Sequence, residues 1–208
     1  MREIFQLLFP EGCAGCFKSG EAFCPSCSQE WKSTIRTSID GIDVTASALY
    51  STSVAHIVLS AKEDNNRHSR AILAEAISRH IDPRSTLIPI PSSTAANRRR
   101  GYDHALLLTE AVAGLTSCRV WPALRANRRV KDQSGLSPAK RFSNLHGAYS
   151  FHDGNAPRGS IVLIDDLVTT GASLREASRA LHSAGIRPSG AVCACIASHR
   201  LPNTIAPY

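Results

Sequence analysis

The chain has 208 residues, of which 43% are hydrophobic and 20% are charged. This length suits one well-packed domain with a small appendage, and the composition excludes an extended disordered chain. The formal net charge of +7 favours anionic partners, although charge alone does not separate a nucleotide from a nucleic acid.

No segment is apolar enough to suggest a membrane partner. The apolar segment within residues 1–10 is too short for a signal peptide, and no other run approaches the roughly 18 apolar residues of a membrane span. We therefore expect a cytoplasmic protein, in which thiols stay reduced and disulfides are disfavoured.

Four of the seven cysteines form two C-x2-C pairs, Cys13 with Cys16 and Cys24 with Cys27. Each pair places two thiolates on one turn, and the two pairs together complete a tetrahedral Zn²⁺ site without an open position for catalysis. A redox or metal-free role is the alternative. We assign residues 1–40 to an N-terminal zinc-binding knuckle and residues 41–208 to the main domain. The other three cysteines are expected to be small buried hydrophobes, namely Cys118, Cys193 and Cys195.

The main domain shows alternating strand and helix patterns. We predict strands at 44–51, 86–90, 118–124, 161–164 and 191–197, and helices at 53–62, 69–81, 103–117 and from 173 onward. For the last helix, Ser173 and Glu176 have the spacing of a capping box, and Gly185 marks the end. Strands that alternate with helices predict an α/β fold with a mostly parallel, doubly wound sheet.

The basic, polar stretch 125–147 has no clear period and is predicted to be a long loop. Loops of this length inside compact domains often act as lids over a ligand. Its cations can reach a diphosphate or a polynucleotide, but each is equally well explained as an exposed solubilising charge. The candidate lid residues are Lys131, Gln133, Lys140 and Arg141.

The segment 161–173 carries the clearest chemical signal. Its apolar strand leads directly into Asp165 and Asp166, at the sheet edge where open parallel sheets bind ligands. Two carboxylates suit two vicinal hydroxyls, so the pattern favours a ribose 5-phosphate over the alternative of a solvated strand-turn-helix corner. A phosphate monoester fits the hydroxyls, backbone N–H groups and helix N-terminus of the loop that follows, which comprises Thr169, Thr170, Gly171, Ala172 and Ser173.

This segment resembles the 13-residue phosphoribosyl-pyrophosphate motif of the type I phosphoribosyltransferases: four apolar residues, two acidic residues, then Thr-Thr-Gly-Ala-Ser. The resemblance implies a type I phosphoribosyltransferase-like fold. It also implies that Asp165 and Asp166 contact ribose hydroxyls and that residues 169–173 contact the 5-phosphate. Mg²⁺ would be held mainly by oxygens of the bound phosphoribosyl pyrophosphate.

Further stretches resemble the ComF-type, or competence protein F, family. These stretches are 88–93, the Arg-rich 98–102, several central positions between 133 and 149, and the four N-terminal cysteines. The family commonly has Phe-Asn-Gln where this chain has Tyr102-Asp103-His104. The turn after residue 90 corresponds to the pyrophosphate loop, whose candidates are Pro91, Ser92 and Ser93, with Arg98, Arg99 and Arg100 as phosphate partners or, alternatively, as a solvated surface turn.

Three functions remain open from the sequence. The first is a phosphoribosyltransferase-like protein that binds phosphoribosyl pyrophosphate, with a link to DNA uptake and a helicase partner that the resemblance implies. The second is a salvage or biosynthetic enzyme that transfers ribose phosphate to a small base or amine. The third is a non-enzymatic factor that binds single-stranded DNA. No catalytic residue is assigned, because no protein nucleophile is needed and no acceptor-binding segment is identifiable.

Overall fold

The structure is a computed structural model that describes residues 12–127, 147–152, 154, 157 and 159–198. The lid candidates Lys131, Gln133, Lys140 and Arg141 lie outside the described residues. Among those that are described, no helix has both the length and the apolar character needed to cross a membrane.

The centre of the fold is a six-stranded sheet with the order β1-β2-β8-β7-β3-β4. Every neighbouring pair in it is parallel except β1 with β2. The α/β class and the mainly parallel sheet predicted from the sequence are therefore confirmed. The strands of this sheet are β1 (Ile35–Ile39), β2 (Ile42–Leu49), β3 (Thr86–Pro89), β4 (Arg119–Val120), β7 (Ile161–Val168) and β8 (Gly190–Ile196).

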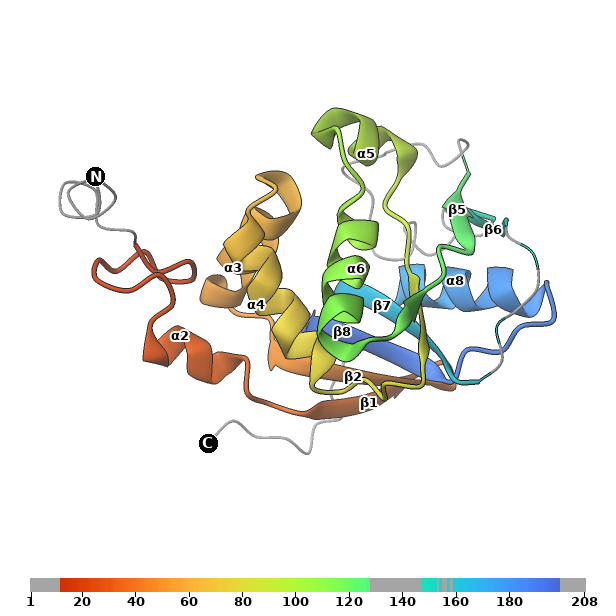
Figure 1. The fold of residues 1–208 in the computed structure, drawn as a ribbon, viewed down its shortest axis with the longest axis horizontal. Helices are drawn as coiled ribbons and strands as arrows, with labels where there is room; N and C mark the ends of the chain where they lie inside the picture. The colour runs from red at the N-terminus through yellow and green to blue at the C-terminus, as the bar shows by residue number, and fades with distance from the viewer. Residues whose placement is uncertain (1–11, 128–146, 153, 155–156, 158, 199–208) are drawn as a thin grey trace.

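Helices cover both faces of the sheet, as Figure 1 shows. On one face, α3, α4 and α6 pack side by side over apolar residues of β2, β3, β7 and β8. On the other face, α8 packs together with a separate two-stranded sheet, β5-β6. The helices are α2 (Pro25–Glu30), α3 (Thr52–Glu63), α4 (Arg67–Ser78), α5 (Thr94–Arg100), α6 (His104–Thr116) and α8 (Ala172–His182), and the small sheet consists of β5 (Leu124–Ala126) and β6 (Tyr149–Phe151).

Two parts of the sheet differ from the sequence interpretation. β1 was not predicted; it lies within residues 1–40 and pairs with β2 through a tight turn in which Asp40 and Gly41 have positive φ. The single strand predicted at 118–124 is instead divided, since β4 joins the main sheet and β5 the small one. Between them, Trp121 turns inward and packs edge-on against Phe151 of β6. Burial of this large ring accounts for the break in the strand.

The three cysteines outside the N-terminal cluster have two environments. Cys193 and Cys195 on β8 are fully buried, as predicted. Cys118 is only partly buried, which corrects the expectation for it, and its thiol donates to the backbone carbonyls of Asp82 and Pro83.

The N-terminus of α8 corrects the predicted capping box. The N-cap is Gly171, in the left-handed conformation, and no side chain caps the helix. Glu176 is 5% exposed and is bound by the guanidinium of Arg179, through Nε at 2.7 Å and through a terminal nitrogen at 2.7 Å. It also accepts the backbone N–H of Tyr149, so it fixes β6 to α8 rather than closing the helix. The end of α8 at Gly185, by contrast, is as predicted, with a left-handed glycine.

We predict that Glu176→Ala lowers the free energy of unfolding by about 2 kcal/mol, because it leaves a buried N–H and a half-buried guanidinium without their acceptor. Urea denaturation measures this change. Glu75→Ala is the matched control, since Glu75 is exposed and its ion pair with Arg79 spans 3.9 Å; its effect should stay within about 0.5 kcal/mol. Equal effects of the two substitutions would contradict the role assigned to Glu176.

Candidate functional site

Asp165 and Asp166, the acidic pair, lie in the part of β7 that extends beyond the end of its neighbour β3. β3 ends at Pro89, which pairs with Ile164, and the N–H of Ile90 then donates to the carbonyl of Ile164. β7 continues to Val168, so the aspartates belong to the strand itself, which is longer than the predicted 161–164. On the side of β3, the chain has already turned away at Asp165 and Asp166. A cleft opens there, at the carboxyl edge of the sheet.

This cleft has a volume of about 430 Å³ and gathers most of the site residues predicted from separate parts of the chain. A smaller hollow beside it shares Asp165 and Ser173 and is formed by the loop 169–172. Arg98 is exposed on α5 and does not line the cleft. The predicted residues that do line it are Pro91, Ser92, Ser93, Arg99, Arg100, Asp165, Asp166 and Ser173.

A larger hollow of about 650 Å³ lies elsewhere, between the cysteine knuckle and helices α3 and α4. Neither the acidic pair nor the loop 169–173 lines it. We place the candidate site in the smaller cleft, because the acidic pair, two arginines of α5 and Ser173 at the start of α8 meet there.

The loop 169–171 needs a glycine at its last position. Gly171 has φ +70°, and a Cβ there would lie 2.7 Å from Cγ2 of Ile39 on β1. The conformation and the close approach both exclude a side chain. The edge strand β1 therefore packs directly against the loop for which the sequence predicts phosphate binding.

Asp166 is a buried carboxylate with two basic neighbours. Its side chain is 5% exposed, Lys62 Nζ lies 2.7 Å from Oδ2, and His104 Nε2 lies 3.3 Å from the same oxygen. Burial alone would raise the pKa of Asp166, but the contacts with His104 and Lys62 outweigh burial and lower it. The carboxyl of Asp166 is therefore ionised at neutral pH.

The pKa of Asp165 is shifted in the opposite direction to that of Asp166. It is partly exposed, and its Oδ1 accepts the backbone N–H of Asp166. Burial and the charge of Asp166 raise its pKa well above the ordinary range. The two carboxyls, adjacent in sequence, thus differ in proton affinity. Asp166 can only accept hydrogen bonds, whereas Asp165 can also donate one when it is protonated. Ribose hydroxyls can bind to both carboxyls.

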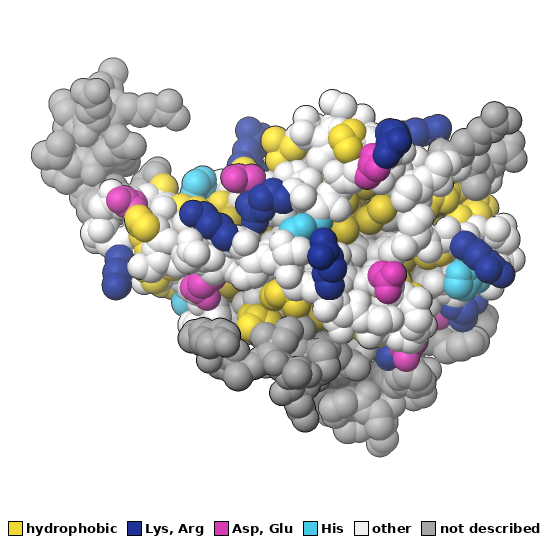
Figure 2. All heavy atoms as spheres, turned by 90° about the horizontal axis from the view of Figure 1, so that it is seen from below, with side chains coloured by type: hydrophobic (Ala, Val, Ile, Leu, Met, Phe, Trp, Pro, Cys, Tyr) yellow, Lys and Arg dark blue, Asp and Glu magenta, His cyan; other side chains and the backbone are white. Residues whose placement is uncertain are grey.

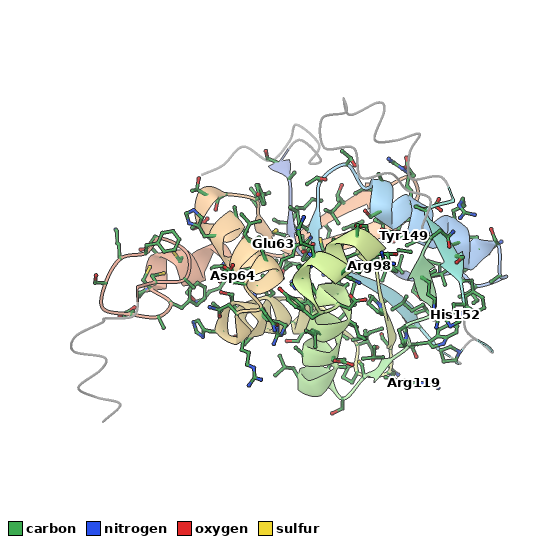
Figure 3. The ribbon with its side chains drawn as sticks, turned by 90° about the horizontal axis from the view of Figure 1, so that it is seen from above. Glu63, Asp64, Arg98, Arg119, Tyr149 and His152 are labelled. Atoms are coloured by element: carbon green, nitrogen blue, oxygen red, sulfur yellow. The ribbon has the colours of Figure 1, made fainter. Side chains whose placement is uncertain are left out.

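The arginines near the cleft lie on a helix, α5, and not on a loose surface turn. Arg100 has a side chain only 2% exposed, 3.3 Å from the carboxylate of Glu63 and 6.0 Å from the ring centre of Tyr102. Arg99 binds the same carboxylate at 2.9 Å. Figure 3 looks down on this region and shows Glu63 at the end of α3 and Tyr149 of β6 on either side of α5, with Arg98 between them.

Four polar cleft residues had no role assigned from the sequence: Lys62, Glu63, His104 and Tyr149. Lys62 and Glu63 occur at the end of an ordinary amphipathic helix, and His104 at the start of another, so no local pattern distinguishes them. Burial raises the pKa of Tyr149 to about 12, so its hydroxyl stays neutral. Only the fold brings these side chains to β7.

The four N-terminal cysteines converge as predicted, with sulfur atoms all within 4.8 Å of one another. Cys16 Sγ and Cys24 Sγ are 3.7 Å apart, close to the spacing of about 3.8 Å that a tetrahedral Zn²⁺ with 2.3 Å bonds requires. Burial opposes ionisation of Cys13, but backbone N–H groups, first that of Cys24, lower its pKa to about 6. This donor set fits a thiolate-bound metal ion such as zinc.

Comparison with known protein families gave no match. The chain is 29% identical over 136 residues to "Competence protein F" of Haemophilus influenzae, which covers 64% of this chain and 55% of that protein. It is 35% identical over 106 residues to "Competence protein ComFC" of Bacillus subtilis, which covers 50% of this chain and 41% of that protein. An "Orotate phosphoribosyltransferase" of Aeropyrum pernix is 33% identical over 81 residues, or 38% of this chain and 42% of that enzyme.

The chain is therefore similar to two proteins named as competence proteins and, over a shorter stretch, to a protein named as a phosphoribosyltransferase. The matched stretches span only about half the length of these relatives. The activities, substrates and partners of the whole relatives are thus not carried over to this chain by similarity alone.

We predict that substitutions of the two aspartates change stability in opposite directions at neutral pH. Asp166→Asn removes the counter-charge of Lys62 and should cost about 3 kcal/mol. Because the folded pKa of Asp166 lies below its unfolded value of about 3.9, this cost is present above that pH and shrinks as the pH falls toward the folded value.

Asp165→Asn should stabilise the protein by about 1 kcal/mol at neutral pH, because the neutral amide avoids the cost of placing an ionisable carboxyl in a desolvated position next to Asp166. The folded pKa of Asp165 is raised, so its own favourable contribution exists only at low pH and is lost as the pH rises through the folded value. Urea denaturation between pH 4 and 8 measures both variants, and equal destabilisation by both at neutral pH would refute the assignment of charges.

Proposed function

We propose that the cleft binds 5-phosphoribosyl-1-pyrophosphate together with Mg²⁺. The observation that carries the proposal is the convergence, at one edge of the sheet, of an acidic pair, a phosphate-type loop and a helix bearing arginines. Each part suits one chemical group of this ligand: vicinal hydroxyls, 5-phosphate and diphosphate. A ribose 5-phosphate alone would leave the α5 arginines without a ligand group.

The ligand itself would supply most of the Mg²⁺ coordination. Among the described residues, the four-cysteine cluster is the only group of three or more potential metal ligands close enough to share an ion. The cleft thus has no carboxylate cage for a hard cation, and Mg²⁺ commonly binds through substrate phosphates with one or two carboxylates. The ion would neutralise the diphosphate beside Asp165 and Asp166.

The wider role that we propose follows the names of the relatives. Two of them are named competence proteins, which supports a role linked to DNA uptake. We further propose a cytoplasmic location and a DNA-uptake helicase as a partner; a role in nucleotide metabolism is the alternative. Direct binding of single-stranded DNA is less favoured by the described surface. On the face seen in Figure 2, the Lys and Arg side chains are dispersed among carboxylates and form no continuous basic surface.

A second candidate is transfer of the phosphoribosyl group to a small base or amine. It is favoured by the stretch similar to an orotate phosphoribosyltransferase. The nucleophile would displace diphosphate from C1 of the ribose, with catalysis by positioning and charge neutralisation. Release of one diphosphate per product, measured with a panel of bases, distinguishes transfer from binding alone.

We predict that calorimetry detects binding of phosphoribosyl pyrophosphate in the presence of Mg²⁺, and that Asp166→Asn weakens it by about tenfold or more, since a hydrogen bond to a charged group is lost. The double variant Asp165→Asn, Asp166→Asn should bind still less. A charge-matched control, Asp82→Asn with Glu75→Gln, alters two exposed carboxylates and should change the affinity by no more than about twofold.

Absence of binding by the folded parent would refute the proposal. If single-stranded DNA bound instead, with an affinity that falls steeply with salt, the protein would be a nucleic-acid-binding factor. Affinity equal for the parent and the double variant would place the ligand outside the acidic pair.

The cysteine cluster is proposed to be a structural zinc site. We predict one zinc ion per chain by elemental mass spectrometry and a lower melting temperature after chelation, because metal binding and folding of a small metal site are coupled. Cys27→Ser should reduce the zinc content, whereas Cys118→Ser, outside the cluster, should not. Full zinc content in Cys27→Ser would contradict the assigned ligand set.

A further inference from the structure

Lys62 connects the acidic pair to the opposite wall of the cleft. The Lys62 side chain is 32% exposed, and its ammonium lies 2.7 Å from Oδ2 of Asp166, which is 104 residues away in sequence. The ion pair lies within the cleft and is partly buried. It is therefore less exposed to solvent screening than a surface ion pair.

The backbone of Lys62 is held as firmly as its side chain. The hydroxyl of Tyr102 donates to the carbonyl of Lys62 at 2.6 Å and accepts the N–H of Asn65 at 3.0 Å. Tyr102 comes from the connection between α5 and α6, and the guanidinium of Arg100 lies over its ring. The end of α3 is therefore attached to the part of the cleft that carries the arginines.

Lys62 and His104 contact the same oxygen of Asp166. Nζ of Lys62 and Nε2 of His104 lie 2.7 Å and 3.3 Å from Oδ2. His104 is 1% exposed, and its contact with Oδ2 is the longer of the two. With Oδ2 occupied by protein groups, Oδ1 is the oxygen left for a ligand.

The cleft has little spare positive charge. Its lining contains three carboxylates, Glu63, Asp165 and Asp166, and three Lys or Arg side chains, Lys62, Arg99 and Arg100. Two of these cations already share Glu63. The acidic pair would repel a polyanionic ligand unless its charge were offset locally, and among the lining cations only Lys62 forms an ion pair with it.

We propose that Lys62 is a positioning residue of this site: it keeps Asp166 ionised, commits Oδ2 to the protein, and so presents Oδ1 and Asp165 to the two ribose hydroxyls of a phosphorylated pentose. The inference rests on the proposed binding of phosphoribosyl pyrophosphate. Lys62 also screens the acidic pair from the phosphates of that ligand. It acts through Asp166 and forms no part of the reaction.

Removal of Lys62 should make binding depend on pH. The titratable and charged groups around Asp166 are Lys62 of α3, His104 of α6, Asp165 of β7, and Cys193 and Cys195 of β8. Of these groups, Lys62 is the only Lys or Arg, and its ammonium contacts the Asp166 carboxyl. Without it, Asp166 would be a buried carboxylate that has lost its nearest cation, so Asp166 should gain a proton at higher pH than in the parent protein and bind a hydroxyl less well.

The first test needs no ligand. In protein labelled with ¹³C at aspartate carboxyl carbons, the resonance absent from Asp166→Asn identifies Asp166. We predict no titration of this resonance above pH 4 in the parent, and a titration that becomes visible above pH 4 in Lys62→Met, because the buried carboxylate then lacks its nearest cation. An unchanged titration in Lys62→Met would overturn the proposal, whether or not the protein binds phosphoribosyl pyrophosphate.

The second test is calorimetry with phosphoribosyl pyrophosphate and Mg²⁺ at several pH values. Lys62→Met should bind about tenfold more weakly at pH 8, and the ratio of its Kd to that of the parent should grow as the pH falls. Lys62→Arg, which keeps the charge, should recover most of the affinity. Lys32→Met removes one exposed charge and should change the affinity by no more than about twofold.

An equal loss in Lys32→Met, or a Kd ratio independent of pH, would show a general charge effect and overturn the positioning role. If Lys62→Met does not fold, Lys62→Gln provides the same comparison with a polar side chain. Failure of the parent to bind the ligand would refute the proposed function, while the carboxyl titration still decides the link between Lys62 and Asp166. The two failures are thus distinguishable.

Discussion

Two adjacent carboxyls at the end of a buried strand impose the constraint on which the rest of the site depends. A chain that places Asp165 and Asp166 there must separate their charges or neutralise one of them. The fold does both: strand alternation sends the two side chains in different directions, and α3 and α6 supply Lys62 and His104 to Asp166. The packing of these helices on the sheet is thus linked to the charge state of the cleft.

The cleft results from a difference in strand length. β3 stops beside Ile164 while β7 continues to Val168, so the acidic pair faces a space that the turn at residues 91–93 borders and α5 covers. The sheet edge supplies the carboxylates, the loop before α8 supplies backbone N–H groups, and α5 supplies guanidinium groups. Because each comes from a different element, their relative positions are set by the packing of the core and not by one flexible segment.

The sequence predicted those features that are local. Alternating elements, the paired cysteines and the motif around Asp165 each lie within a short stretch, and each is present in the fold. Contacts over long separations escaped prediction: Lys62 and Asp166 are 104 residues apart, and β1 is recognisable only through its pairing with β2. The capping box failed for a related reason, because Glu176 has a stronger partner in Arg179 and a buried N–H of β6 to satisfy. Tertiary context decided each of these cases.

Helix α3 joins the two chemical centres of the molecule. Near its first turn, His56 Nδ1 lies 2.7 Å from the carbonyl of Gly15 in the knuckle, and Ser51 donates to Glu30 at the end of α2. Its last turn carries Lys62 and Glu63, which contact the acidic pair and the α5 arginines. Folding of the knuckle therefore contributes to the ordering of the helix that completes the cleft. This explains why a cysteine cluster remote from the acidic pair belongs to the same structural unit: whatever stabilises the knuckle also stabilises the residues that hold Asp166 in place.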